Sequence, residues 1–417
     1  MPRALDVAYE MRTVEAVRKD ILDAVKPLDP VTVPLMDAWG CVLVEDAIAP
    51  YDIPTFASSA MDGYAVRAED VAGAGESPVI LRRVGSAFIG KTPDAQVGPG
   101  EAIWIATGAP VPPGADCIAP KEDVTAEPDK VTVNKAFKSG MFVRPPGQDL
   151  KEGDVVVPGG KILSGPELGN LSTAGFGAVT VYPKVRVCVV STGDELVEPG
   201  TKPAFGQIPD GNGYTISGNL RELGIAPVRP PIVPDDEDLL RNLFVSRAPE
   251  IDVFISSGGM SVGDLDVVKK VVSELGRIDS YKVAMQPGMP QAFGVVEGRT
   301  YFGLPGNPVS VFVSFELFIR PALLKMMGRT DLFRPVITAS IDEEMEGLPD
   351  KTRYSRVFVY SENGAWRARS TGPAASNLLG TVVKANGLAV IPPGDQAVKA
   401  GDQVRVQLFR PLEQVQG

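Results

Sequence analysis

The sequence contains no histidine. This absence excludes a Ser-His or Cys-His nucleophile, a histidine general base and a histidine metal ligand. Cys41, Cys117 and Cys188 lie far apart without C-x-x-C spacing, so we expect buried thiols and neither a disulfide framework nor a zinc cluster. Chemistry must therefore rest on carboxylates, lysines, backbone groups and a bound ion.

Long apolar runs and an excess of positive charge are also missing. The longest apolar run of the C-terminal half, residues 309–319, is interrupted by Ser310, Ser314 and Glu316, and residues 1–15 hold no signal-like apolar segment. We therefore expect a cytoplasmic protein with no membrane partner. The net charge of −11 argues against nucleic acid, because such binding needs a basic surface.

The overall composition is typical of a globular protein. The chain has 417 residues, of which 44% are hydrophobic and 22% charged, enough for roughly two to four domains. Thr13 is expected to cap a helix carrying Val17, Ile21 and Val25 on one stripe. A Ser-x-x-Glu capping box at residues 164–167 predicts another helix.

Residues 67–144 are rich in glycine and proline between short β-like runs, which indicates a small β domain. Within it, GSAFIGKT at residues 85–92 matches the Walker A expression letter for letter. A phosphate loop must open a helix, yet Pro93 follows at once. We therefore interpret this match as accidental.

Strands and helices alternate from residue 184 onward. We expect strands at 184–190, 228–233, 253–255 and 281–285, and helices beginning at Asn212 and spanning 236–244 and 267–275. This βαβ repetition predicts a doubly wound, mostly parallel sheet that binds ligands at the carboxyl ends of its strands. Residues 291–296 and 300–304 are expected to form a hairpin, and strands from 336 onward a terminal β domain.

Unusual residues gather at those strand ends. They are residues 192–195, Asp235, the glycine-rich turn 256–266, and residues 286–288. The turn contains Ser257, Gly258, Gly259, Ser261, Gly263, Asp264 and Asp266, and the loop Pro305, Gly306, Asn307 and Pro308 faces the same edge. Glycines let the backbone approach a ligand, and a first helical turn favours an anion. We expect a small anionic ligand.

Carboxylates beside an anion require a cation between them. The carboxylates in question are Glu195, Asp235, Asp264 and Asp266. A carboxylate about 4 Å from a phosphate repels it by roughly 4 kcal/mol at an effective dielectric near 20, whereas a helix N-terminus returns about 0.3–2 kcal/mol. Oxygen-only ligands suit Mg²⁺, which bridges carboxylates to substrate phosphates. The sequence therefore predicts metal-assisted phosphate chemistry.

Five motifs occur in one order along the chain: SAMDGYAV at 59–66, TGAPVP at 107–112, STGDEL at 191–196, SSGGMSVGD at 256–264 and LPGNPVS at 304–310. On these motifs the chain resembles, over essentially its full length, the molybdopterin molybdenumtransferases, the MoeA and gephyrin E-domain family. Five motifs in register are far more specific than any one of them.

The resemblance implies a multidomain fold of α/β and β type. It implies a discontinuous linking α+β domain at 1–45 and 147–183, and a β domain inserted at 46–146. A molybdopterin-binding α/β domain at 184–329 and a C-terminal β-barrel at 330–417 complete the expected architecture.

The resemblance also implies the reaction. Adenylylated molybdopterin and molybdate bind, the pyrophosphate bond is hydrolysed with Mg²⁺, AMP leaves and molybdenum enters the dithiolene. The family positions carried over are Asp62, Thr107, Asp149, Glu195, Asp235, Asp266, Lys282, Pro305, Pro308 and Ser376. We expect Asp62, Glu195, Asp235, Asp266 and Lys282 to be catalytic, Glu195 and Asp266 to hold the metal, and the others to bind substrate.

The family further implies a homodimer with shared active sites. It also implies that a molybdopterin adenylyltransferase acts upstream and supplies the substrate. This sequence departs from many relatives, which read K-P-G-K-P where it has Gln286 to Pro290, Asp where it has Ala57, and Arg near Lys351. We expect Lys282, Gln286 and the backbone near Gly288 and Gly306 to hold the oxyanion. Two alternatives stay open, an adenylyltransferase-like enzyme and a non-enzymatic scaffold of the gephyrin type.

Overall fold

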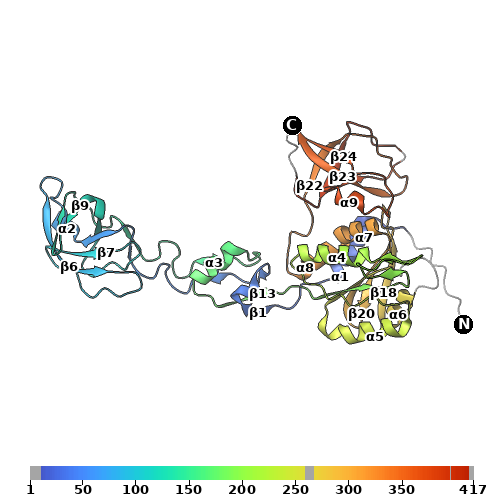
Figure 1. Cartoon of the computed structure of the whole chain (residues 1–417), viewed down its shortest axis with the longest axis horizontal. Coiled ribbons are helices and arrows are strands. Elements are labelled where there is room, and N and C mark those ends of the chain that lie inside the picture. The colour runs from blue at the N-terminus through green and yellow to red at the C-terminus, as the bar shows by residue number, and fades with distance from the viewer. Residues whose placement is uncertain (1–10, 259–266, 395, 413–417) are drawn as a thin grey trace. The chain divides into compact units, whose positions relative to one another are not determined.

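The structure, a computed structural model, describes residues 11–258, 267–394 and 396–412. The chain divides into two compact units (Figure 1). Thr32–Trp39 and Leu43–Thr180 form one, called here the β unit. The other described residues form the second, called the α/β unit.

A six-stranded sheet dominates the β unit. Its order is β8-β5-β7-β6-β10-β9, with β6 and β7 parallel and the other neighbours antiparallel. The strands are β5 (Gly63–Val66), β6 (Val79–Ala87), β7 (Glu101–Ile105), β8 (Cys117–Pro120), β9 (Val124–Ala126) and β10 (Lys130–Val133). In β10, Val131 and Val133 are buried while the residues between and before them are not, the period of two that a strand requires.

Shorter elements complete this unit. They are helix α2 (Ala68–Val71), helix α3 (Gly165–Thr173), the 3₁₀ turns Leu35–Ala38 and Lys121–Asp123, and the antiparallel pairs β3 (Ala47–Ile48) with β12 (Val155–Val157) and β4 (Ser58–Ser59) with β11 (Val143–Arg144). Ser164 and Glu167 form the predicted capping box of α3. A further three-stranded sheet has the order β1 (Val31–Pro34), β13 (Ala178–Tyr182), β2 (Val42–Leu43).

A five-stranded sheet lies at the centre of the α/β unit, in the order β14-β17-β21-β20-β18. Its strands are β14 (Val187–Ser191), β17 (Val253–Ser257), β18 (Gly276–Lys282), β20 (Pro290–Val296) and β21 (Arg299–Leu304). Its helices are α1 (Val14–Ala24), α4 (Gly211–Glu222), α5 (Glu237–Arg247), α6 (Val267–Leu275), α7 (Pro308–Ser314) and α8 (Arg320–Met326), with a π-helical stretch, Phe315–Ile319, joining α7 to α8 and a 3₁₀ turn at Ala248–Glu250.

Helices cover both faces of this sheet (Figure 1). Val187 and Val189 of β14 pack in one apolar cluster with α1, α4, α7 and α8, whereas Cys188 and Val190 pack in a second cluster with α5 and α6. Successive side chains of a strand point to opposite faces, so one strand serves both clusters. The predicted Thr13 cap of α1 is confirmed, since its hydroxyl accepts a hydrogen bond from the Ala16 N–H.

The predicted fold class is confirmed, but the sheet is mixed rather than mostly parallel. β14, β17 and β21 run parallel, while the β20–β21 hairpin and the β18–β20 pair are antiparallel. The strand predicted at 228–233 is reduced to two isolated bridges, Cys188 with Val228 and Thr192 with Val233. Pro230 and Pro231 lie between these bridges, and proline donates no backbone hydrogen bond to a ladder.

A closed β-barrel follows in the C-terminal region. Its strands are β22 (Val336–Ile341), β23 (Thr352–Glu362), β24 (Ala365–Ser370), β25 (Gly387–Ile391) and β26 (Gln403–Leu408), and the β23–β25 pairing closes the ring. Short β19 (Met285–Gln286) pairs with β23, and helix α9 (Gly380–Val383) precedes β25. The strand predicted at 281–285 is therefore divided, because β18 ends at Lys282 and β19 joins the barrel.

The three cysteines are buried and free, as the sequence predicts. Burial raises the pKa of Cys117 and of Cys188 to about 12, so both are neutral thiols at physiological pH. None of the helices in the described ranges has both the length and the apolar character needed to cross a membrane.

Candidate functional site

The carboxyl edge of the central sheet brings two acidic loops together. Thr192 follows β14 and donates its hydroxyl hydrogen bond to the Asp235 carboxylate at 3.2 Å. The backbone N–H of Asp235 in turn donates to the Asp194 carboxylate, also at 3.2 Å. These two bonds tie together loops that leave the sheet at neighbouring positions.

Glu195 lies exposed on the first of these loops. Its carboxylate folds back over Gly193, so that a Cβ placed on Gly193 would lie 2.4 Å from Glu195 Oε2. Gly193 also has φ +144°, a backbone conformation that favours glycine. No hydrogen bond or ion pair of the Glu195 side chain is found within residues 11–258, 267–394 and 396–412. Its two oxygens are available to a ligand.

The end of β17 reaches the same edge. Ser257 is only 3% exposed, and its hydroxyl is buried without a hydrogen-bond partner in the described part of the chain. Gly258 has φ +94°, and a Cβ there would lie 3.2 Å from the Thr192 carbonyl oxygen. The backbones of the two strand ends therefore approach each other closely, which only glycine permits here.

Part of the predicted glycine turn lies outside the described residues. The candidates concerned are Gly259, Ser261, Gly263, Asp264 and Asp266. In the described residues helix α6 spans Val267–Leu275, within which the sequence pattern predicts a helix.

A cavity of about 510 Å³ unites most of the predicted oxyanion residues. We call it the oxyanion pocket; it is lined by Met285, Gln286, Pro287, Gly288, Met289, Pro290, Pro305, Asn307, Ser310, Leu348, Lys351, Ala374, Ala375, Ser376 and Asn377. The predicted residues Gln286, Pro305, Asn307 and Ser376 meet here. Lys282 is not among the lining residues, although it pairs with Pro290 across β18 and β20.

The charge of this lining is notable in an acidic chain. It includes Lys351, whose ammonium lies 3.9 Å from the carboxylate of Asp350, and no carboxylate lines the cavity itself. Pro308 begins α7, but the N–H of Val309 already donates to the Ser376 carbonyl at 3.0 Å, so this first turn is partly satisfied. The Gly306 carbonyl accepts from the Asn212 amide at 2.7 Å. The lining suits an anion held by polar and cationic side chains.

Gln291 holds the part of the oxyanion pocket that contains Gly288. This buried amide donates to the Gly288 carbonyl at 2.6 Å and to the Ser314 hydroxyl at 2.5 Å. Gly288 has φ +98°, and a Cβ there would lie 2.8 Å from Ser314 Oγ. The turn that carries Gln286 is therefore fixed against α7.

A second part of the lining, residues 374–377, is held by Arg356, which is only 4% exposed. Its guanidinium donates to the carbonyls of Pro373 and Ala375 at 2.5 and 3.2 Å and to the Thr381 hydroxyl at 3.0 Å. Burial lowers the pKa of Arg356, and carbonyl oxygens compensate part of its desolvation. The loop carrying Ser376 is thus anchored by a buried cation.

A separate cluster surrounds Asp62 in the β unit. The Asp62 carboxylate accepts from both the backbone N–H and the hydroxyl of Thr107, each at 2.8 Å, and Lys121 Nζ lies 3.4 Å away. The Thr107 backbone hydrogen bond, followed by its hydroxyl and by Lys121, lowers the pKa of Asp62. The structure therefore brings the predicted residues Asp62 and Thr107 together.

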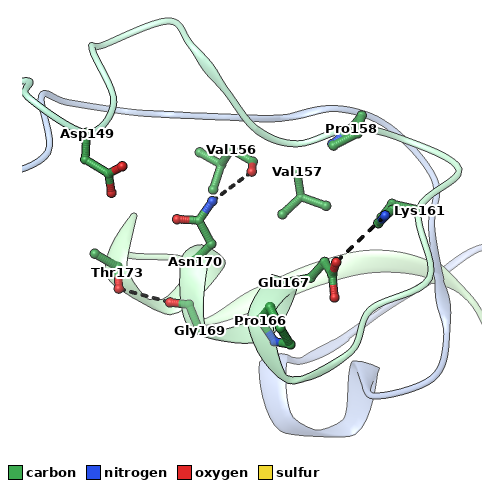
Figure 2. A pocket seen from close by; sticks show the side chains of 10 residues that line it. All are labelled: Asp149, Val156, Val157, Pro158, Lys161, Pro166, Glu167, Gly169, Asn170 and Thr173. Carbon is green, nitrogen blue, oxygen red and sulfur yellow. Dashed lines mark hydrogen bonds and ion pairs between the residues drawn. The ribbon is translucent and has the colours of Figure 1, made fainter.

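Asp149 lies elsewhere in the β unit, at a cavity of about 500 Å³ (Figure 2). We call it the α3 pocket; it is lined by Asp149, Val156, Val157, Pro158, Lys161, Pro166, Glu167, Gly169, Asn170 and Thr173. Asp149 is not among the hydrogen-bond partners of Asp62 or Thr107. The sequence-predicted residues of the β unit thus fall into two places.

Sequence reasoning missed Asp210, a carboxylate only 1% exposed. It accepts from Ser191 Oγ at 2.5 Å, from the Gly213 N–H at 2.8 Å and from Arg229 at 2.9 Å. Asp210 is also the cap of α4, the role predicted for Asn212. Asp and Asn are about equally good caps, so local sequence did not distinguish them.

Comparison with known proteins covers almost the whole chain. The sequence matches the family descriptions "MoeA N-terminal region (domain I and II)" over residues 12–175, "Probable molybdopterin binding domain" over 188–325 and "MoeA C-terminal region (domain IV)" over 338–409.

Curated relatives agree with these matches. The chain is 38% identical over 403 residues to molybdopterin molybdenumtransferase 2 of Mycobacterium tuberculosis, covering 95% of this chain and 99% of that protein. It is 33% identical over 406 residues to a molybdopterin molybdenumtransferase of Haemophilus influenzae, covering 96% and 100%. The crystal structure of a molybdopterin biosynthesis MoeA protein from Pyrococcus horikosii aligns with a TM-score of 0.80 at 31% identity, covering 96% and 100%.

Proposed function

Because this chain belongs to the MoeA family of molybdopterin molybdenumtransferases, and is thus a transferase of molybdenum cofactor biosynthesis, we propose the reaction in detail. Its substrates are molybdate and adenylylated molybdopterin. It inserts molybdate and releases AMP in a step that depends on Mg²⁺.

The oxyanion pocket carries this proposal. In a chain with a net charge of −11, its lining contains a lysine, amides and hydroxyls but no carboxylate. A tetrahedral oxyanion needs hydrogen-bond donors and no like charge nearby. Gln286, Asn307, Lys351 and Ser376 supply such donors, and Gln291 and Arg356 hold two parts of the lining in place.

The carboxylates at the sheet edge are the proposed place for Mg²⁺, with Glu195 and Asp266 as its ligands. The donor chemistry fits, because Glu195 presents two exposed oxygens without a protein partner in the described residues. No group of three histidine, cysteine or carboxylate side chains positioned for a metal occurs in the described ranges, which exclude Asp266. When bound, Mg²⁺ would neutralise the charge that develops on the phosphate oxygens.

The protein groups have separate proposed tasks. Asp235 orients the acidic loop through Thr192, and Gln286 holds the oxyanion beside the backbone of Gly288 and Gly306. Lys282, which pairs with the lining residue Pro290 but does not line the pocket, would act on the oxyanion from the end of β18. Ser257, Gly258 and the turn to Asp264 bind the phosphates of the substrate. Asp62, kept ionised by Thr107 and Lys121, acts on the same substrate from the β unit.

We further propose a cytoplasmic homodimer in which Asp62 of one subunit and Glu195 and Asp266 of the other complete each site. A molybdopterin adenylyltransferase would supply the substrate. The four domain ranges given by the sequence remain part of this proposal.

Molybdate-dependent AMP release tests the reaction. The purified chain should release AMP from adenylylated molybdopterin only when both molybdate and Mg²⁺ are present. An adenylyltransferase-like enzyme would instead consume ATP and molybdopterin, and a scaffold would do neither. Either result would reject the proposed activity.

Complementation tests the shared site. Asp62→Asn and Asp266→Asn are purified separately, then unfolded and refolded together so that mixed dimers form. If sites are shared across a two-fold axis, each mixed dimer has one intact site, and random pairing restores about a quarter of wild-type activity. Inactive mixtures that contain verified mixed dimers would place both residues in one subunit's site.

A further inference from the structure

The loop that carries Glu195 is anchored at its base by a short parallel ladder. In this ladder β15 (Leu196–Val197) pairs with β16 (Ile208–Pro209), the segment that leads into α4. The N–H of Ile208 donates to the carbonyl of Glu195 at 2.8 Å. The backbone of Glu195 is therefore joined to a segment whose next residue is the buried Asp210.

The charge of this loop is of one sign. Residues 187–201 contain three carboxylates, those of Asp194, Glu195 and Glu198, and no lysine or arginine. Carboxylates so close in sequence repel one another, and the loop itself has no cation to offset them. The compensating charge comes from another segment, in the form of Arg229.

Arg229 joins two carboxylates through one nitrogen atom. Its Nη2 donates to Asp210 Oδ2 at 2.9 Å and to both oxygens of Glu198, each at 3.1 Å. The guanidinium also lies over the ring of Tyr214 in α4, 4.4 Å from the ring centroid. Because Asp210 is buried and caps α4, Arg229 attaches the exposed Glu198 to a fixed part of the fold.

The segment that contains Arg229 also holds the other end of the loop. Asp235 lies six residues further along this segment, and its backbone N–H donates to the Asp194 carboxylate. The loop is thus attached at Asp194 on one side of Glu195 and at Glu198 on the other. Glu195 lies between two attachment points on the same neighbouring segment.

We propose that Arg229 is a positioning residue for Glu195, an inference that rests on the proposed role of Glu195 as a Mg²⁺ ligand. By holding Glu198 against Asp210, Arg229 keeps the loop in the conformation that exposes the Glu195 carboxylate. Groups that orient a metal ligand without touching the metal contribute to its affinity. Arg229 therefore has two opposed effects, because its charge repels a cation while its contacts place the ligand that binds one.

Binding of Mn²⁺ to the substrate-free, full-length protein, measured by electron paramagnetic resonance, separates these two effects. Mn²⁺ takes the same oxygen ligands as Mg²⁺. Arg229→Gln should weaken Mn²⁺ binding by about threefold to tenfold, because Glu195 loses its fixed position. A pure charge effect has the opposite sign, since removal of a cation tightens the binding of another cation. Tighter or unchanged Mn²⁺ binding by folded Arg229→Gln would overturn the proposal.

A second variant guards against unfolding, because Arg229→Gln leaves the Asp210 carboxylate buried without its cation. The double variant Arg229→Gln with Asp210→Asn removes both charges and leaves the net charge unchanged. Asparagine is about as good a helix cap as aspartate, so α4 keeps its cap. Circular dichroism melting checks that each variant folds. This double variant should also bind Mn²⁺ more weakly, and wild-type affinity in the folded protein would contradict the positioning role.

Glu198→Gln and Glu274→Gln form a matched pair at the exposed end of the contact. Both glutamate side chains are 44% exposed, and each is paired with an arginine, Glu198 with Arg229 and Glu274 with Arg241. Glu198→Gln should weaken Mn²⁺ binding, whereas Glu274→Gln should bind Mn²⁺ like wild type. Equal losses in the two variants would show a general effect of charge and would overturn the proposal.

The positioning inference and the proposed function fail in different ways. If Glu195→Gln weakens Mn²⁺ binding but the folded Arg229 variants do not, Glu195 remains a cation ligand and the inference is wrong. If Glu195→Gln itself leaves Mn²⁺ binding unchanged, the proposed metal role of Glu195 is wrong and the inference fails with it. Molybdate-dependent AMP release by the wild type is measured separately and decides the reaction.

Discussion

Asp62 in the β unit and Glu195 in the α/β unit are both predicted catalytic carboxylates, yet their surroundings differ. Asp62 accepts two hydrogen bonds from Thr107 and lies beside Lys121, so its orientation and charge are set by the protein. Glu195 is exposed and only folds over Gly193. A carboxylate whose charge is already compensated is suited to orient a substrate, whereas an uncompensated one is suited to hold a cation.

Substitution of each carboxylate by its amide should separate these roles. Glu195→Gln should lower molybdate-dependent AMP release by at least about a hundredfold, with partial recovery at high Mg²⁺, because an amide is a poorer ligand for a hard cation. Asp62→Asn should also lower turnover but leave the Mg²⁺ concentration dependence unchanged. Turnover measured across a Mg²⁺ series checks both, and an unchanged Mg²⁺ dependence in Glu195→Gln would contradict the cation role.

A substitution in the oxyanion pocket should have a smaller effect than the carboxylate substitutions, and it should strengthen molybdate binding rather than lower turnover. Gln286→Lys should tighten molybdate binding by about fivefold to tenfold, because a charged donor makes a stronger bond to an oxyanion than a neutral amide does. Lys282→Ala should weaken it. Half-saturating molybdate in the AMP-release assay measures both changes. If neither variant alters the molybdate dependence, the anion binds elsewhere.

How far local sequence can predict this site depends on the range of the contacts. The Thr13 cap and the Ser164–Glu167 box were predictable because each is formed within one helical turn. The meeting of the 192–195 and Asp235 loops was expected because both follow segments predicted to end at one edge of the sheet, although the second segment, 228–233, forms only isolated bridges. Asp210, which bonds Ser191 and Arg229 from distant segments, could not be found in this way.

The residues that hold the lining of the oxyanion pocket in place could not be predicted from local sequence either. Gln291 reaches Ser314 of the helix after the next strand, and Arg356 of the barrel holds the loop carrying Ser376. Neither residue belongs to a recognisable motif, and both act through long-range packing. The resemblance identified residues that would contact substrate, while the structure was needed to identify those that hold them in place.

The pH response of Asp62 provides a finer test of its compensated charge. Its folded-state pKa is lowered, so Asp62 contributes stability above its unfolded-state pKa of about 3.9, and this contribution is lost as pH falls through the folded-state pKa. Thr107→Val removes one of the two Thr107 hydrogen bonds and should move the pKa of Asp62 upward, while the backbone N–H remains. Carboxyl NMR titration of Asp62 measures this, and a pKa equal to that of wild type would show that the hydroxyl contributes nothing.

The smallest effect is expected in the Walker A look-alike, where residues of the β unit resemble a nucleotide site without forming one. Val79–Ala87 is strand β6, so Gly85 begins no phosphate loop, and the next helical element after Thr92 is the 3₁₀ turn Lys121–Asp123. Phe88 packs on Trp104 at 5.5 Å between ring centroids, which is a packing role. Lys91→Ala should therefore leave AMP release within about twofold of wild type, because without a following helix no row of backbone N–H groups surrounds a phosphate. Lys121→Ala, which removes a cation that does contact Asp62, is the matched comparison and should reduce activity. A hundredfold loss in folded Lys91→Ala would mean that this loop binds phosphate by some other geometry.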